Sequence, residues 1–170
     1  MEEQKKCLKD LTVFSRLNNE EIELICQSGY EKAYKEGEII FFENDSFKKL
    51  YLLVKGKVKL SMLSPEGKEK VMTILQQGDI LGEISLFDQD PHPLTAEVMD
   101  EARLMIIPWE NLESIIIDHP RLALKIIEAL SKKTRLLTSQ VRDLVFQDAA
   151  GRLASLLTRF KEDFGIEIEE

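Results

Sequence analysis

Few side chains in this sequence have the types and spacing that catalysis or metal binding requires. The 170 residues include two histidines, His92 and His119, and two cysteines, Cys7 and Cys26. A metal-dependent enzyme of the barrel type needs histidine and carboxylate ligands in clusters, and the two histidines stand far apart. No nucleophile stands out beside a base. These residues argue against an enzyme and predict no metal site.

The same residues restrict redox cofactors without identifying one. An iron–sulfur cluster needs about four thiolates, so we do not expect one in a chain with two cysteines. Haem needs an axial histidine, cysteine or methionine, and His92 is kept as a minor alternative. Cys7 is flanked by Lys5, Lys6 and Lys9. Because nearby cations lower the pKa of a thiol, a thiol switch at Cys7 is a second minor alternative.

The segment Gly78–Phe87, which reads GDILGEISLF, has the composition of a ligand-binding turn. A short helix beginning near Gly82–Ser85 would present unpaired backbone N–H groups, which attract anions. Gly82 would let the backbone approach a ligand closely. Glu83 would accept a hydrogen bond from a sugar hydroxyl. The alternative is local: Gly82 serves a turn, and Glu83 caps the helix or forms a salt bridge.

The residues around this segment predict a roll of short strands. From about Tyr30 to Pro108, short apolar runs alternate with turn residues, a pattern typical of a closed sheet, sandwich or roll. Ser64-Pro65-Glu66-Gly67 predicts a hairpin turn. Strands are expected at residues 38–42, 50–54, 57–63, 69–75 and 94–107, the last broken in the middle. In the strand 57–63, the alternating residues Val58, Leu60 and Met62 are expected to face the core.

Helical patterns flank the strands on both sides. Before them, Asn18 or Asn19 is expected to cap a helix, and another helix is expected earlier, where Leu8, Leu11, Phe14 and Leu17 recur at three-residue steps. After them, residues 121–147 contain neither glycine nor proline, and Pro120 suits a first helical turn. The predicted fold class is therefore α+β: an antiparallel, jelly-roll-like β-roll with N-terminal helices and a long C-terminal helix.

The long helix carries two apolar stripes. One repeats in steps of four and three, the spacing that faces a partner helix in a coiled coil; it consists of Ala123, Ile127, Leu130, Thr134, Leu137, Val141 and Leu144. The other, through Leu122, Ile126 and Leu136, would pack on the β-domain. Since one small domain can hardly cover both stripes, we predict a homodimer. A helix packed only on its own domain is the alternative.

Residues 148–170 predict the beginning of a further helix. Asp148 is a good N-cap, and Leu153, Leu156, Leu157 and Phe160 follow with helical spacing. The last seven residues alternate apolar and acidic side chains, which favours a truncated chain. The predicted organisation is an effector-sensing domain at 1–119, a dimerisation helix at 120–147, and a hinge with one helix of a truncated domain at 148–170.

The charge of the chain restricts its partners. The net charge is −8, whereas nucleic-acid binding relies on a positive surface, so DNA binding by this chain alone is not expected. The negative field also disfavours anionic ligands at long range. No apolar run follows the first methionine, and no apolar stretch is long enough to span a bilayer. We therefore expect a cytoplasmic protein without membrane contact.

The cassette Gly78–Phe87 resembles the ligand cassette of the cyclic-nucleotide-binding domain, in the version found in the Crp/Fnr family. The order of strands, cassette and long helix is similar too, and Phe146, Asp148 and Gly151 look like the family's hinge. The resemblance covers nearly the whole chain. It implies the effector-sensing and dimerisation part of a transcription regulator, which contacts DNA only through a C-terminal domain absent from these residues.

The resemblance implies an effector pocket and shows where this chain departs from the family. Cyclic-nucleotide binders of the family place an arginine and then a serine or threonine after the glutamate, because arginine neutralises the cyclic phosphate. This chain has His92 and Pro93 there. Proline has neither a hydroxyl nor an N–H, and histidine is mostly neutral near pH 7. We therefore expect weak or absent cyclic-nucleotide binding and either another small-molecule effector or a vestigial pocket. The expected pocket residues are Gly82, Glu83, Ile84, Ser85, His92, Pro93, Leu94 and Thr95.

Thr138 and Ser139 complete the expected site. In cyclic-AMP-binding relatives, small hydroxyl residues midway along the long helix contact the base. Thr138 matches one such position, whereas Leu137 replaces the other. The alternative is that both are ordinary exposed helix residues. A free-standing cyclic-nucleotide-binding module is the alternative function, and the hinge residues count against it.

Overall fold

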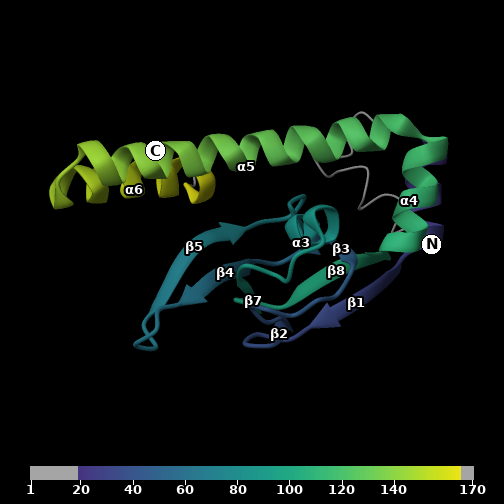
Figure 1. The fold of residues 1–170 in the computed structure, drawn as a ribbon, viewed down its shortest axis with the longest axis horizontal. Coiled ribbons are helices and arrows are strands. Elements are labelled where there is room, and N and C mark those ends of the chain that lie inside the picture. Colours follow the sequence, from purple (N-terminus) through teal and green to yellow (C-terminus); the bar gives the residue numbers. More distant parts are fainter. Residues whose placement is uncertain (1–18, 166–170) are drawn as a thin grey trace, which may run out of the picture. The chain divides into compact units, whose positions relative to one another are not determined.

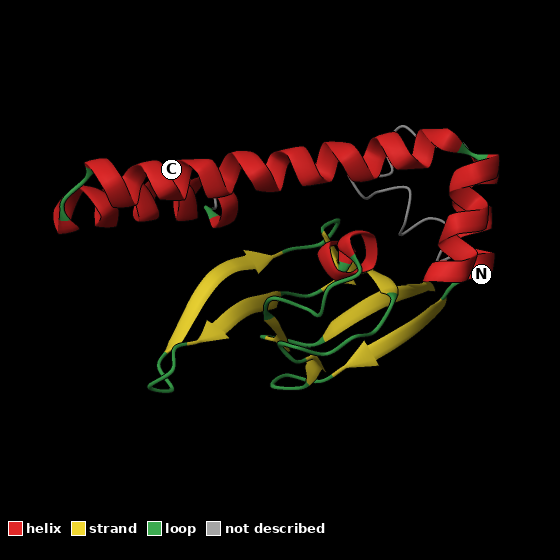
Figure 2. Ribbon diagram, in the orientation of Figure 1, coloured by secondary structure: helices red, strands yellow, loops and turns green. Residues whose placement is uncertain are grey.

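The computed structural model describes residues 19–165 as an α+β fold built around a two-layered β-roll (Figures 1 and 2). This confirms the predicted fold class. The elements in chain order are α2 (Asn19–Ser28), β1 (Tyr30–Tyr34), β2 (Ile39–Phe41), β3 (Lys49–Lys55), β4 (Val58–Leu63), β5 (Glu69–Leu75), β6 (Ile80–Leu81), α3 (Glu83–Asp88), β7 (Thr95–Val98), β8 (Ala102–Pro108), α4 (Trp109–Asp118), α5 (Pro120–Phe146) and α6 (Ala149–Phe164). The helix expected around Leu8–Leu17, the cap Asn18, Cys7 and the residues after Gly165 lie outside the described residues.

The strands form two four-stranded antiparallel sheets (Figure 2). One has the order β1-β8-β3-β6 and the other β2-β7-β4-β5. Apart from the hairpin of β4 and β5, neighbouring strands in both sheets are distant in the chain, as in a roll. The pairing of β6 with β3 sets Leu81 opposite Tyr51, which positions the start of α3 against the first sheet.

The main core lies between the two sheets. It is built from the side chains that the strands turn inward, and Ile40 and Leu94 pack against its edge. Alternation along each strand produces this segregation, since successive side chains point to opposite faces. The core residues are Tyr34, Phe41, Tyr51, Leu53, Val58, Leu60, Leu75, Leu81, Ala96, Val98, Ala102, Leu104 and Ile106.

A second apolar layer lies where α2 and α4 contact β8, as Figure 1 shows for α4. Ile22 and Ile25 of α2 are buried, as are Leu112 and Ile115 of α4. Met105 of β8 is buried but does not belong to the core between the sheets. The strand β8 is therefore covered on both faces, which explains its continuous apolar sequence.

The strand predictions are confirmed in outline, with one error. Residues 69–75 match β5 as predicted, and the region 94–107 is indeed broken, into β7 and β8. In β4, however, the pairing with β5 shifts between Leu60 and Ser61. This bulge moves Ser61 to the inside and leaves Met62 exposed, so the prediction that Met62 faces the core is wrong. The strand β1 and the helix α4 were not predicted.

The helix α5 confirms the predicted long helix and bears on its second stripe. Leu122 and Ile126, near its beginning, are buried. Two compact units are distinguished, one ending at Ala129 and the other beginning at Leu130, so the boundary falls within α5. No described helix is both long enough and apolar enough to cross a membrane.

Candidate functional site

The predicted cassette, residues 78–87, includes β6 and most of α3. The backbone geometry at position 82 requires a glycine. Gly82 lies in the left-handed region, with φ of 84°, and precedes the first residue of α3. A Cβ at this position would lie 2.7 Å from the Lys49 carbonyl oxygen and 3.0 Å from Cδ2 of Tyr51. The close backbone approach that glycine permits is thus made to β3.

The helix α3 turns polar side chains into the protein. Glu83 is 2% exposed and Ser85 is 3% exposed. Ile84 and Phe87, in contrast, are exposed, and the Phe87 ring meets the Trp109 ring edge-on with centroids 5.7 Å apart. A buried carboxylate is costly unless other groups stabilise it, so Glu83 is the polar feature that most distinguishes this site.

His92 is the second buried polar residue of the site. Its imidazole is stacked on the Phe41 ring, with centroids 3.9 Å apart and planes 13° from parallel. Its backbone N–H donates to the Asp45 carbonyl at 2.9 Å, and its carbonyl accepts from the Asn44 N–H at 2.8 Å. These bonds join His92 to the loop between β2 and β3.

The imidazole of His92 forms only part of the hydrogen bonds that its two nitrogens could make. The side chain is buried, and Nε2 has no hydrogen-bond partner among the described residues. Burial lowers the pKa of His92, although Asp45, Glu83, a hydrogen bond with the Phe47 backbone and Asp88 act in the opposite direction. Since burial outweighs these groups, His92 is neutral at pH 7.

An aromatic wall continues from His92 into the core. The Phe41 and Tyr51 rings lie 5.6 Å apart, at 47° to each other. Burial raises the pKa of Tyr51 to about 12, with smaller electrostatic contributions from the neighbouring Tyr34, Tyr30 and Asp45. The Tyr51 hydroxyl is therefore protonated at neutral pH.

Six of the predicted site residues meet at one small cavity. The cavity has a volume of about 30 Å³ and is lined by Phe41, Leu60, Gly82, Glu83, Ile84, His92, Pro93 and Leu94. Such a volume is far below the roughly 300–1,000 Å³ of small-molecule pockets and suits about one water molecule. An effector can therefore enter only if the lining moves.

Two residues of the predicted pocket do not line the cavity, and two of its lining residues were missed. Ser85 is buried elsewhere on α3, and the Thr95 hydroxyl accepts a hydrogen bond from the Glu43 N–H at 3.0 Å. Phe41 and Leu60 line the cavity, although the sequence indicated them only as strand residues. Nothing in the pattern pairs Phe41 with His92, because the two are distant in the chain.

The lining contains no arginine and no lysine, and Glu83 is its only carboxylic acid side chain. A ligand phosphate would thus meet a carboxylate, a neutral imidazole and a proline. None of these supplies the positive charge that holds phosphates in proteins. Among residues 19–165, no group of three or more histidine, cysteine and carboxylate side chains could hold a metal ion.

Thr138 and Ser139 belong to the second compact unit. The Thr138 hydroxyl donates to the Thr134 carbonyl at 2.9 Å, and Ser139 accepts from Arg142 at 3.3 Å. Both contacts lie within α5. Contact of these two residues with an effector stays a prediction.

The predicted dimer stripe on α5 is largely exposed in the single chain. Ala123 and Leu130 are half-buried, and Thr134 is exposed. The large apolar members are exposed as well, with Leu144 at 62%. The exposed apolar members are Ile127, Leu137, Val141 and Leu144.

The predicted hinge joins α5 to α6. Phe146, the last residue of α5, is exposed. The Asp148 carboxylate accepts from the Gly151 N–H at 2.8 Å, which confirms Asp148 as the N-cap of α6. Two side-chain contacts that the sequence did not predict connect the helices: Arg159 with Asp143 at 2.8 Å, and Ser155 with Gln147 at 3.0 Å.

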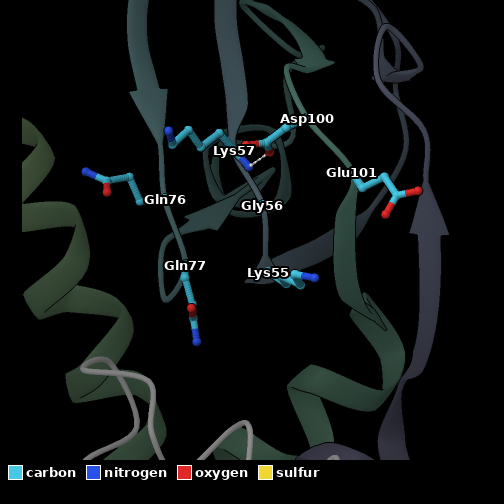
Figure 3. A pocket seen from close by; sticks show the side chains of 7 residues that line it. All are labelled: Lys55, Gly56, Lys57, Gln76, Gln77, Asp100 and Glu101. Carbon is cyan, nitrogen blue, oxygen red and sulfur yellow. Dashed lines mark hydrogen bonds between the residues drawn. The ribbon is translucent and has the colours of Figure 1, made fainter. Parts of the chain in front are cut away.

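A larger concavity lies among three loops of the roll (Figure 3). Its volume is about 470 Å³, and it is lined by Lys55, Gly56, Lys57, Gln76, Gln77, Asp100 and Glu101. The Asp100 carboxylate accepts from the Lys57 backbone N–H at 2.6 Å. Gln77 and Glu101 point in different directions in Figure 3, so the side chains do not converge on one ligand position.

Comparison with known proteins identifies the family. The model of the cyclic nucleotide-binding domain matches residues 31–119, just over half of the chain. The CRP-like cAMP-activated global transcriptional regulator of Mycobacterium tuberculosis is 31% identical over 132 residues, which are 78% of this chain and 59% of that protein. The anaerobic regulatory protein of Bacillus subtilis is 28% identical over 146 residues, 85% of this chain and 61% of that protein.

A solved structure agrees with these relatives. The Thermus thermophilus catabolite activator protein superposes with a TM-score of 0.71 at 26% identity, over 89% of this chain and 71% of that one. The chain thus spans about three-fifths of the length of the M. tuberculosis and B. subtilis relatives. The names of these relatives are those of transcription regulators and not of enzymes.

Proposed function

The chain belongs to the cyclic nucleotide-binding domain family, in its Crp/Fnr branch, and we propose that it is the effector-sensing and dimerisation portion of a transcription regulator. The effector site is the cavity between α3 and the His92–Pro93 segment. The dimer interface is the exposed apolar stripe of α5, and the hinge is the junction of α5 with α6. In this division, the sensing domain comprises residues 1–119, the dimerisation helix residues 120–147 and the hinge region residues 148–170.

One observation carries the proposal for the effector site: His92 and Glu83, both 2% exposed, line the same cavity in the segment that the family uses for its ligand. Burying a neutral imidazole with an unsatisfied nitrogen and a carboxylate costs free energy. Groups whose protonation is perturbed by burial are common at functional sites, so a buried residue of this kind beside a cavity is a candidate for function.

The cavity does not suit cyclic AMP. The cyclic phosphate carries a negative charge, and the lining offers Glu83 in place of a cation. Pro93 donates no hydrogen bond. We therefore propose that this protein does not respond to cyclic AMP in the manner that the M. tuberculosis relative's name describes.

The effector proposal is tested by calorimetric titration of the purified chain with cyclic AMP and cyclic GMP. An absorption spectrum of the untreated protein, taken first, shows whether haem copurifies. We expect no binding at micromolar concentrations. Micromolar affinity for either nucleotide would show that His92 and Pro93 leave the phosphate site working.

The dimer proposal is tested by sedimentation equilibrium. Replacing Leu137 and Val141 by glutamate places like charges opposite each other in a paired helix, so the dimer should dissociate at least about tenfold more readily. Arg135→Glu is the matched control, because Arg135 lies off the apolar stripe and is exposed. Equal sedimentation of the two variants would contradict pairing through this stripe.

Contact with DNA is proposed for the full regulator only. The net charge of −8 disfavours DNA binding by these residues alone. A shift of α5 on effector binding would reach DNA-contacting residues through the hinge at Phe146–Gly151. Such coupling requires that the effector bind two conformations with different affinities. A cytoplasmic location is part of the same proposal.

A further inference from the structure

Within the proposed effector site, the position of His92 indicates what kind of ligand the cavity accepts. The cavity has a volume of only about 30 Å³, and the imidazole of His92 lines it. This ring lies flat on Phe41 with centroids 3.9 Å apart. A planar nitrogen heterocycle thus already stacks on Phe41 beside the cavity, and the chain itself supplies it.

Three carboxylic acid side chains act electrostatically on the His92 ring. Asp45, Glu83 and Asp88 each favour a positive charge at the ring. They come from three places: the loop after β2 and both ends of α3. No lining residue is a lysine or an arginine. The site therefore opposes an anion, and because burial still keeps the His92 ring neutral, it favours an uncharged ring over a cationic one.

The hydrogen-bonding groups point to the same class of ligand. His92 Nε2 is buried without a partner among the described residues. Glu83 contributes an acceptor to the lining, while Pro93 cannot donate from its backbone. A ligand that replaced the imidazole would be held by stacking on Phe41 and by donation to Glu83.

We propose that this cavity accepts an uncharged planar nitrogen heterocycle, stacked on Phe41 in the place of the His92 ring, and that it excludes anionic ligands. His92 occupies the site in the unliganded chain and is displaced when the effector binds. The proposal rests on the function proposed above, since it concerns the ligand of the same cavity.

The experiment removes the internal ring and offers external ones that differ in charge. In His92→Ala, the cavity gains the volume of an imidazole. The probes are imidazole, which is neutral or cationic near pH 7, and tetrazole, a planar five-membered ring that is anionic at this pH. Binding is measured by NMR titration, with the Phe41 ring resonances as reporters. Five-atom ligands bind weakly, so titrations extend to tens of millimolar.

We expect imidazole to bind His92→Ala at least about tenfold more tightly than tetrazolate, since a nearby carboxylate in a buried site separates the two charges by that much. The wild-type chain, whose own ring occupies the site, should bind imidazole more weakly. Adding Glu83→Gln to His92→Ala should reduce the preference for imidazole. Equal or tighter binding of tetrazolate would overturn the proposal while leaving the effector site in place.

Failure of the proposed function has a different signature. If His92→Ala folds and binds neither ring, the cavity is no ligand site, and both proposals for it fall. If His92→Ala does not fold, saturation-transfer NMR on the wild-type chain makes the same comparison. The order imidazole before tetrazolate is then required, and the reverse order overturns the proposal.

Discussion

The requirement for glycine at position 82 leads to a quantitative prediction for Gly82→Ala. An alanine in the left-handed region costs roughly 1–2 kcal/mol. The added Cβ would lie 2.7 Å from the Lys49 carbonyl oxygen, which belongs to the backbone and yields only if β3 or α3 moves. Overpacking of this kind costs about 1–3 kcal/mol more. The free energy of unfolding should therefore fall by about 2–5 kcal/mol.

Gly67→Ala is the matched control. Gly67 has φ of 78°, close to the 84° of Gly82, but a Cβ there would meet nothing within 4 Å. Only the backbone term applies, so the loss should be roughly 1–2 kcal/mol. The difference between the variants isolates the close approach of Gly82 to β3.

Thermal unfolding, followed by circular dichroism at one protein concentration, measures both variants. For a chain of this size, 1 kcal/mol corresponds to about 2–4 °C in Tm, so Gly82→Ala should lower Tm by roughly 4–20 °C. A fixed concentration is needed because dimerisation makes Tm depend on it. If Gly82→Ala were no more destabilising than Gly67→Ala, the contact between the cassette and β3 would be refuted.

Three further predictions concern His92 and the helix junction. Because the pKa of His92 is lowered in the folded chain, the unfolded chain binds more protons just below pH 6.5, and the free energy of unfolding should fall as the pH drops through that value. The variant His92→Gln should weaken this pH dependence when urea unfolding is measured at pH 8 and pH 5.5. An unchanged pH dependence would exclude His92 as its source. Arg159→Ala should lower the free energy of unfolding by about 1–3 kcal/mol, since it removes the guanidinium 2.8 Å from the buried Asp143 carboxylate. Additive losses in a double-mutant cycle with Asp143→Ala would show that the ion pair contributes nothing. The double variant His92→Arg, Pro93→Ser should gain at least about tenfold in affinity for cyclic AMP by calorimetry, because it supplies a cation and a hydroxyl; no gain would mean that the cavity is closed by more than these two residues.

The sequence predicted those parts of the fold that depend on local patterns. Residues 121–147 lack glycine and proline, and Pro120 precedes them, so the helix α5 followed from composition alone. The hairpin at Ser64–Gly67 forms with the Gly67 N–H donating to the Ser64 carbonyl at 2.8 Å. The cap Asp148 followed from the preference of helix starts for short acidic side chains.

The features that the sequence did not predict depend on contacts between distant segments. The bulge at Leu60–Ser61 arises in the pairing of β4 with β5, and the alternation within β4 gives no sign of it. The same is true of the bond between Arg159 and Asp143, which joins two helices. The strand β1 was missed because its sequence, YEKAY, is rich in charge; only its pairing with β8 makes it a strand.

The candidate site divides in the same way. A reading of residue types along the chain identified the positions of Gly82, Glu83, His92 and Pro93, and it also identified what chemistry His92 and Pro93 lack. It did not predict that the His92 ring would be stacked on Phe41, because that contact connects β2 with the segment after α3. Yet this contact changes the interpretation of the histidine that stands at position 92 in place of an arginine. A histidine in place of arginine would, by itself, mean a weakened phosphate site. On the proposal made above, a histidine that is buried and stacked on Phe41 instead occupies the site, and an effector would compete with a ring and not with water.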